Sequence, residues 1–147
     1  MRLWHVDLLP VLPRKQLVSQ WRECCAIAGS IAKRGTPNHP LVNKVLSSRD
    51  DFVVYTAHVI EELHKRGYKI SYNARVKFTE NVFSNSLTFE HLYRHPKPFP
   101  EWFNDRYFFQ CYYNLQEKYD CGMIECSDWL KIEHIYNQKL IALSEKL

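Results

Sequence analysis

Residues 14–31, RKQLVSQWRECCAIAGSI, form the longest well-marked helical pattern in the chain. Apolar residues recur there every three or four positions, at Leu17, Val18, Trp21, Cys24, Cys25, Ala28 and Ile31. That spacing is typical of a helix with one buried face. The opposite face carries the basic residues Arg14, Arg22 and Lys33, and Gly35 with Pro37 marks the end of the helix.

The segments on either side of this helix are predicted from their prolines, glycine and helix-capping residues. Pro10 and Pro13 predict that the first dozen residues are extended rather than helical. After the helix, a short helical stretch is expected over residues 38–46. The segment SRDD at 48–51 resembles a capping box, and it should open a helix that ends at Gly67, after basic residues in its last turn.

In the second half of the chain, a region without clear periodicity is followed by two regions with a helical pattern. Residues 68–72 read as extended, residues 84–93 as a possible short helix, and the three prolines at 96, 98 and 100 as a stiff loop. From Pro100, apolar residues four apart predict a helix ending near Tyr119, before Gly122. Ser127 should cap a last helix, with its inward residues at Trp129, Ile132, Tyr136, Leu140 and Leu143.

Four or five helices without a convincing strand pair predict an all-α fold, a compact single-domain helical bundle with an extended N-terminal segment. The 147 residues suit one domain over 1–147, in which residues 71–97 read as an insertion or a divergent segment. A hydrophobic share of 46% excludes a disordered chain. No apolar run approaches a membrane span and the first residues resemble no signal peptide, so a cytoplasmic protein without membrane contact is expected.

The positive charge is concentrated in the first third of the chain. Residues 1–49 hold eight Lys or Arg residues against two acids, a net charge of +6, whereas the whole chain carries +4. Such asymmetry favours a surface that faces a polyanion. An ordinary solvated face is the alternative reading of the same charges.

The cysteines and histidines do not form a recognisable metal motif. Five cysteines, at 24, 25, 111, 121 and 126, match neither a zinc pattern nor a secreted disulfide framework. Cys24, Cys25 and Cys111 are expected to be reduced core thiols. His91 and His95 are four residues apart, but prolines follow them directly and a third ligand is missing from the pattern. No metal site and no cofactor are predicted.

Glu23 is the one acidic residue between Asp7 and Asp50. A carboxylate among so many cations is expected to be ionised at neutral pH. It could serve chemistry at a polyanionic substrate, or it could simply pair with a neighbouring cation, a contact worth under about 1 kcal/mol if exposed.

The residues around Glu23 also carry a family resemblance. The matching segments are residues 1–5 (MRLWH), 12–14 (LPR), 16–17 (QL) and 22–24 (REC), followed by 64–70 (HKRGYKI) and weaker matches over 98–118. In this order they resemble the pyrimidine-dimer DNA glycosylases of the bacteriophage endonuclease V type, and a bacterial branch most closely. Three features depart from the family pattern. Residue 2 is Arg rather than a small residue, so Met1 is expected to be retained, which places one extra residue between the chain start and Glu23. Gln16 stands where a histidine is expected, and Ala26 where an arginine is expected.

The resemblance implies a DNA repair glycosylase with abasic-site lyase activity on double-stranded damaged DNA, expected to act as a monomer. The α-amine of Met1 would be the nucleophile that forms an imine, and Glu23 the carboxylate that assists at the sugar. An α-amine titrates at about 7.7–8.0, so part of it is neutral near pH 7. DNA contacts are expected from basic residues of the first third: Arg2, Arg14, Arg22, Lys33, Arg34 and His39.

Aromatic side chains are further candidates, since damaged DNA is recognised partly through kinking and unstacking. Trp4 and His5 are predicted lesion or stacking contacts, with Trp102 as a weaker candidate and Trp129 as a core residue. Two other functions stay open on the sequence. One is a DNA-binding helical module without catalysis, and the other is a protein-interaction domain without a DNA role.

Overall fold

The computed structural model describes residues 2–33, 39–84 and 97–147, and within them the fold is all-α without a strand. The elements are a 3₁₀ helix η1 and six α-helices, with bounds η1 Val6–Val11, α1 Arg14–Ala32, α2 Pro40–Leu46, α3 Arg49–Lys65, α4 Tyr72–Val82, α5 Asp105–Asp120 and α6 Cys126–Ser144. The predicted fold class is confirmed. The helix considered for residues 84–93 falls almost entirely outside the described residues.

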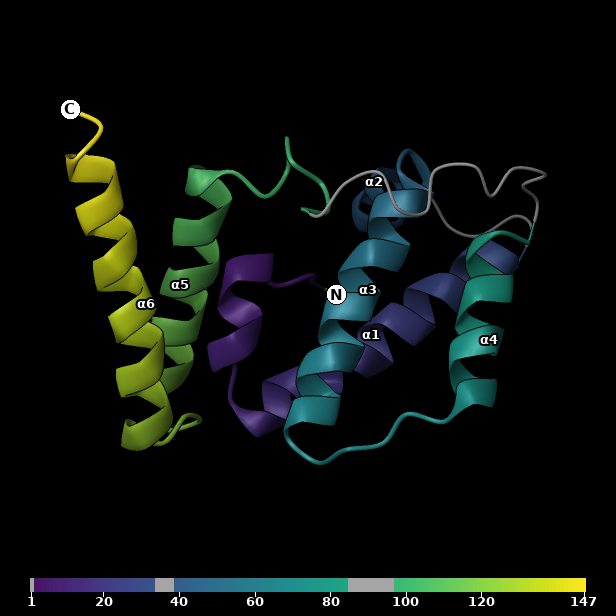
Figure 1. Ribbon diagram of the computed structural model, residues 1–147, viewed down its shortest axis with the longest axis horizontal. Coiled ribbons are helices and arrows are strands. Elements are labelled where there is room, and N and C mark those ends of the chain that lie inside the picture. Colours follow the sequence, from purple (N-terminus) through teal and green to yellow (C-terminus); the bar gives the residue numbers. More distant parts are fainter. Residues whose placement is uncertain (1, 34–38, 85–96) are drawn as a thin grey trace.

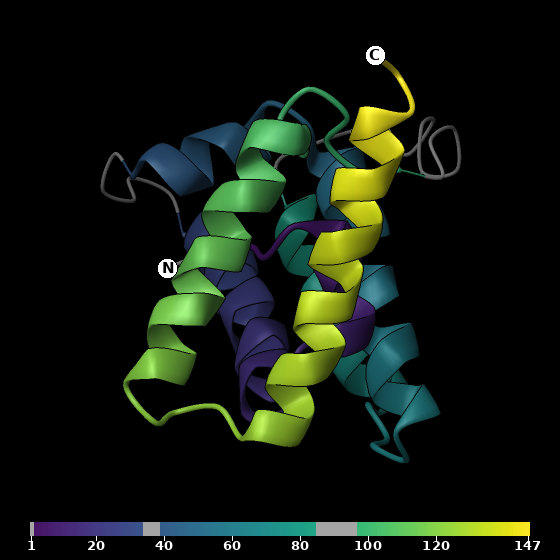
Figure 2. The ribbon, with the colours of Figure 1, turned by 90° about the vertical axis from the view of Figure 1, so that its left-hand side faces the viewer.

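The N-terminal segment runs through the middle of the molecule. The antiparallel helices α5 and α6 lie on one side of η1, and α1 to α4 lie on the other (Figure 1). After a quarter turn, η1 is seen behind the α5–α6 pair (Figure 2). Because η1 packs on both α3 and α6, the first residues of the chain are held between two groups of helices.

The structure corrects the expectation that the first dozen residues are extended. Residues 2–5 carry no helix, but Val6–Val11 form η1, with Pro10 inside it. The φ that proline imposes is also the φ of a 3₁₀ helix, so Pro10 fits there. The His5 ring accepts the Asp7 N–H at the start of this helix.

Helix boundaries follow the predicted pattern more closely than their caps do. Gly67, at φ +89°, ends α3 as predicted. Ser48 precedes α3, but its side chain makes no capping hydrogen bond, so the predicted capping box is not formed. Helix α5 starts later than Pro100, after Asn104, whose side chain accepts the Tyr107 N–H. Helix α6 begins one residue before the predicted cap, Ser127.

Helix α4 lies in the region for which no helix was predicted. Ser71 caps it, accepting the Ala74 N–H. Only Phe78 and Val82 of the helix are fully buried, which is too short a stripe for a pattern to reveal. They pack into the main hydrophobic core, and the helix lies along α1, so α4 is an integral part of this fold.

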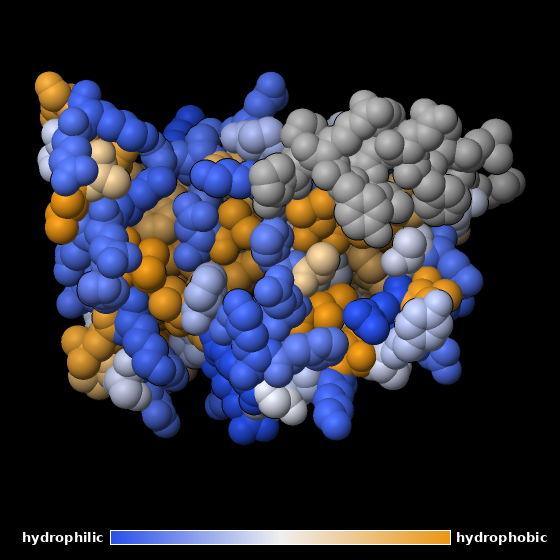
Figure 3. Space-filling model, in the orientation of Figure 1, coloured by the Kyte–Doolittle hydropathy of each residue, from blue (hydrophilic) through white to orange (hydrophobic). Residues whose placement is uncertain are grey.

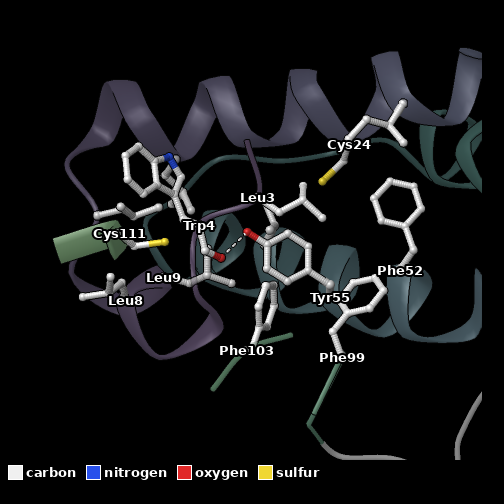
Figure 4. Close-up of a cluster of buried hydrophobic side chains, with 14 of the residues drawn as sticks. Leu3, Trp4, Leu8, Leu9, Cys24, Phe52, Tyr55, Phe99, Phe103 and Cys111 are labelled. Carbon is white, nitrogen blue, oxygen red and sulfur yellow. Dashed lines mark hydrogen bonds between the residues drawn. The ribbon is translucent and has the colours of Figure 1, made fainter. Parts of the chain in front are cut away.

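The core is one continuous cluster around the N-terminal segment. Leu3, Trp4, Leu8 and Leu9 meet residues of α1, α3 and the loop before α5, and Tyr55 points its hydroxyl at the backbone of Trp4 (Figure 4). Hydrophilic residues cover most of the visible described surface, with hydrophobic ones exposed at the edge formed by α6 (Figure 3), where Leu130, Leu140 and Ile141 are exposed. Leu140 was predicted to point inward and does not.

Arg66 ties the end of α3 to the N-terminal segment. Its guanidinium donates to the carbonyl oxygens of Leu12 at 2.7 Å and Pro10 at 3.1 Å, and to Glu62 at 2.9 Å. Since these bonds satisfy carbonyls at the end of η1, we expect Arg66→Met to lower the free energy of unfolding by about 1–3 kcal/mol, measured by urea denaturation. The neighbouring Lys65, exposed in its pair with Glu61, supplies the control. If Lys65→Met costs as much, the bonds of Arg66 contribute no specific stability.

Candidate active site

A pocket of about 720 Å³ lies where the N-terminal segment, the first half of α1 and the end of α5 meet. Most of its lining residues are polar, and three predicted site residues, Arg2, Trp4 and Glu23, are among them. The lining residues are Arg2, Trp4, Lys15, Gln16, Ser19, Gln20, Glu23, Asn114, Lys118, Gly122 and Met123. Residues from opposite ends of the chain therefore form one site.

Glu23 lies in this pocket as a carboxylate that forms no ion pair with any described residue. It is half-buried, and its Oε2 is fully enclosed yet has no hydrogen-bond partner among the described residues. None of the ion pairs found in the described part of the chain includes Glu23. Within the described residues, Glu23 therefore does not form the ion pair that was its alternative role. A buried acceptor without a donor is costly, which is typical of a group kept for a ligand or a reaction.

Cations from three parts of the chain line the same pocket as this carboxylate. Arg2 comes from the N-terminal segment, Lys15 from the start of α1 and Lys118 from the last turn of α5. The Arg2 guanidinium lies 5.3 Å from the centre of the Trp4 ring. A pocket with three cations and one acid is suited to bind a phosphate-bearing substrate while presenting one carboxylate to it.

The backbone of residues 2–4 is held by side chains of three helices. The Gln20 amide of α1 donates to the Arg2 carbonyl at 2.9 Å and accepts the Trp4 N–H at 2.7 Å. The Tyr55 hydroxyl of α3 lies 2.8 Å from the Trp4 carbonyl, and the Tyr107 hydroxyl of α5 donates to the Leu3 carbonyl. Burial raises the pKa of both tyrosines, so both remain protonated donors at neutral and mildly alkaline pH.

Four of the other predicted DNA contacts lie among the described residues and do not line the pocket. Arg22 is exposed on α1, about 100° around the helix axis from Glu23. Arg14 is exposed and stacks over the Tyr68 ring, and Lys33 lies about 15 Å along the axis from Glu23. His39 caps α2 by accepting the Leu41 N–H. Met1 and Arg34 lie outside the described residues, and all six stay predictions as site residues.

The predicted stacking residues differ in their burial and in their neighbours. The expectation for His5 is wrong, because its ring is 2% exposed and packs between Phe103 and Phe108. It bonds the Phe103 carbonyl at 2.9 Å, and burial lowers its pKa. Trp4 is nearly buried and forms a wall of the pocket. Trp102 is half-buried, with the Lys44 ammonium 4.8 Å from its ring centre, and Trp129 is a core residue, as predicted.

Sequence reasoning missed several residues of the pocket. On α1 these are Lys15 and the polar residues Ser19 and Gln20, and on α5 they are Asn114 and Lys118. Gln16 entered within the matching segment 16–17 and as a position where a histidine is expected, but not as a site residue. Its Oε1 is buried without a partner among the described residues. Gln16, Gln20 and Glu23 are spaced three and four apart, a polar stripe on α1 that could have been noticed. No local signal marks Lys118, which α5 brings in from the second half of the chain.

The cysteines of the site region are free thiols. Cys24 and Cys111 are buried and Cys25 is half-buried, and burial raises the pKa of Cys24 to about 12. Among the described residues, no group of three or more His, Cys, Asp or Glu side chains gathers as metal ligands would; His91 and His95 lie outside them. None of the helices in that part of the chain has the length and apolar character needed to cross a membrane.

Comparison with known proteins gives one match. A family model described as pyrimidine dimer DNA glycosylase matches residues 1–76. This range runs from the chain start to the first turns of α4, and it includes Arg2, Lys15, Gln20 and Glu23 but not Lys118. Neither a curated protein nor a solved structure gives a significant match.

Proposed function

Because the chain belongs to the pyrimidine dimer DNA glycosylase family, we propose that it removes damaged pyrimidines from double-stranded DNA and then breaks the strand at the abasic site. One observation carries the catalytic part of this proposal. Glu23 presents an enclosed carboxylate oxygen, unpaired within the described chain, in a pocket that Arg2 also lines. The site thus has a carboxylate for the reacting sugar and cations for the phosphates that flank it.

The chemistry we propose starts from the α-amine of Met1. The neutral amine attacks C1′ of the damaged nucleotide, a nitrogen–carbon bond forms, and the bond from C1′ to the base breaks as the base leaves with its electron pair. Loss of a proton and opening of the sugar ring give an imine. Such a covalent intermediate divides a difficult substitution into easier steps.

Glu23 acts on the same carbon in this proposal. Its carboxylate stabilises the positive charge that develops at C1′ as the base departs. It then accepts and returns protons as the ring opens and the imine forms. Removal of a proton from C2′ of the imine expels the 3′-phosphate by β-elimination, and water finally releases the sugar from the amine.

Borohydride trapping tests the proposal directly. Reduction of the imine converts it to a stable amine, so the protein should become covalently attached to a duplex that contains an abasic site. Glycosylase action is measured separately, on duplexes with a cyclobutane dimer or an oxidised pyrimidine. Binding of the abasic duplex without any adduct would instead identify the DNA-binding module without catalysis, and absence of binding would contradict both.

We expect Lys15 and Lys118 to hold DNA phosphates. Each phosphate contact released should reduce the slope of log K against log salt concentration by about 0.9. The double variant Lys15→Gln, Lys118→Gln should therefore bind undamaged duplex more weakly, with a slope lower by about 2, measured by fluorescence anisotropy over a salt series. Lys131→Gln, on the exposed surface of α6, is the control. An unchanged slope in the double variant would exclude both lysines from the DNA contact.

A further inference from the structure

Gln20 is a buried polar side chain whose partners point to a role in the reaction. It is 1% exposed, and its amide group bonds the main chain of two residues, Arg2 and Trp4. The Tyr55 hydroxyl adds a contact of 2.9 Å to the same Oε1. An apolar side chain at this position of α1 would be buried at lower cost than an amide. We therefore relate the amide of Gln20 to the backbone groups of Arg2 and Trp4 that it bonds.

The position of Gln20 relates the start of the chain to Glu23. The two residues are three apart on α1, which places them about 4.5 Å apart along the helix axis, and both line the pocket. Arg2, whose carbonyl Gln20 fixes, is one residue from the α-amine. Because consecutive α-carbons are about 3.8 Å apart, we expect a fixed Arg2 to restrict where the amine of the preceding residue can reach.

We propose that Gln20 is a positioning residue, which holds the backbone of residues 2–4 against α1 so that the α-amine of Met1 is delivered to the sugar beside Glu23. This role rests on the proposed function. Tyr55 and Tyr107 complete the arrangement, since they bond the carbonyls of Trp4 and Leu3. The backbone of each residue from 2 to 4 is therefore held by at least one helix. Arg2 is held by α1, Leu3 by α5, and Trp4 by α1 and α3.

The expected benefit of this hold is the orientation of the amine. An amine on a free chain end would sample many directions, and the reacting atoms must approach to roughly 3–3.5 Å in the correct alignment. A misplacement of 1 Å can cost on the order of 100-fold in rate. Gln20 removes this freedom before the substrate binds, while making no contact with the reacting atoms itself.

The first test compares Gln20→Leu with the parent in single-turnover borohydride trapping on an abasic duplex. Leucine has nearly the same size but cannot bond either peptide, so we expect trapping about 10- to 100-fold slower with the dissociation constant for the duplex unchanged. Thr56→Val is the matched control, since it removes another buried polar group, a hydroxyl that bonds the Phe52 carbonyl within α3 and does not hold residues 2–4. A folded Gln20→Leu protein that traps at the parent rate overturns the proposal.

A second variant keeps the proposal testable should leucine impair folding. Gln20→Glu keeps the acceptor for the Trp4 N–H but loses the donor to the Arg2 carbonyl until its carboxyl is protonated. The groups that share its surroundings are Arg2, Lys15, Glu23 and Lys118 of the pocket and Tyr55 of α3. These groups are present in both the variant and the parent. The ratio of their trapping rates therefore reports the effect of the side chain at position 20 alone.

We expect that ratio to rise as the pH falls from 8 to 6, and a ratio that does not change with pH would contradict the role of the amide donor. The proposed function fails in a different way. If the parent itself forms no adduct, the imine chemistry is wrong. If the parent forms one and both Gln20 variants match it, only the positioning role is wrong.

Discussion

An extra residue placed before Met1 should abolish imine trapping while leaving DNA binding intact. The added residue turns the α-amine of Met1 into an amide nitrogen, which is not nucleophilic, and carries the new amine beyond the segment that Gln20, Tyr55 and Tyr107 hold. Loss of a covalent nucleophile costs other enzymes up to about 10⁶-fold. We expect a loss of at least about 10³-fold in trapping rate, measured in single turnover.

The control for this experiment is a tag of equal length at the other terminus, which lies at the end of α6 and away from the chain start (Figure 2). The tagged protein should trap at the parent rate. Peptide mapping of the reduced adduct gives an independent result, because the DNA fragment should remain on the residue 1 peptide. An adduct on Lys15 or Lys118 would show that a lysine of the pocket is the nucleophile, and would contradict the role of the α-amine.

The parent should also show a characteristic pH dependence in this assay. Only the neutral amine attacks, and α-amines ordinarily titrate at about 7.7–8.0. The trapping rate should therefore rise with pH from 6 to about 9 and then level off, since the amine is about half neutral near pH 8. Tyr55 and Tyr107 stay protonated across this range because burial raises their pKa, so the hold on residues 2–4 persists. A rate that continued to rise steeply toward pH 10 would favour a lysine.

Sequence patterns predicted the helices well where one face of a helix is continuously apolar, as in α1. They missed α4, whose buried surface rests on Phe78 and Val82 alone, and they predicted an extended chain for η1, because a proline fits a 3₁₀ helix as well as an extended segment. The capping box at Ser48 was wrong for a similar reason. A side chain that matches a motif still needs a backbone geometry that tertiary contacts decide.

The site was predictable only in part, for a physical reason that Glu23 and Gln20 illustrate. Glu23 is an isolated acid among cations, a property of the sequence itself. In the sequence, Gln20 cannot be distinguished from a glutamine on the surface of a helix. Its contacts form only when the N-terminal segment folds back onto α1. Lys118 is more than ninety residues away in sequence and reaches the pocket through the packing of α5. Such long-range contacts leave no local pattern.

The second large effect is expected for Glu23→Gln. Glutamine keeps the size of the side chain but carries no charge to stabilise C1′ and cannot accept a proton at neutral pH. General base and electrostatic contributions of single groups are typically about 10²–10⁴-fold. We expect a loss in that range for strand cleavage at an abasic site, measured by single-turnover gel assay.

Binding should change in the opposite direction, which separates this result from misfolding. Removing the one acid of a pocket lined by Arg2, Lys15 and Lys118 raises its positive charge, so the duplex should bind as tightly as to the parent or more tightly. The variant should also be at least as stable, because a buried carboxylate oxygen unpaired within the described chain is replaced by a neutral group of equal size. Greater stability with lost activity is typical of a residue kept for function.

Asp7→Asn is the matched control for charge, since Asp7 is the other acid of residues 1–49 and is exposed outside the pocket. It should cleave abasic DNA at the parent rate. Should Glu23→Gln also cleave at the parent rate, the carboxylate has no part in the reaction, and the enclosed oxygen must be explained by binding alone. Should Glu23→Gln lose both cleavage and binding, Glu23 would be a structural support of the pocket, because a change toward positive charge cannot weaken DNA binding by electrostatics.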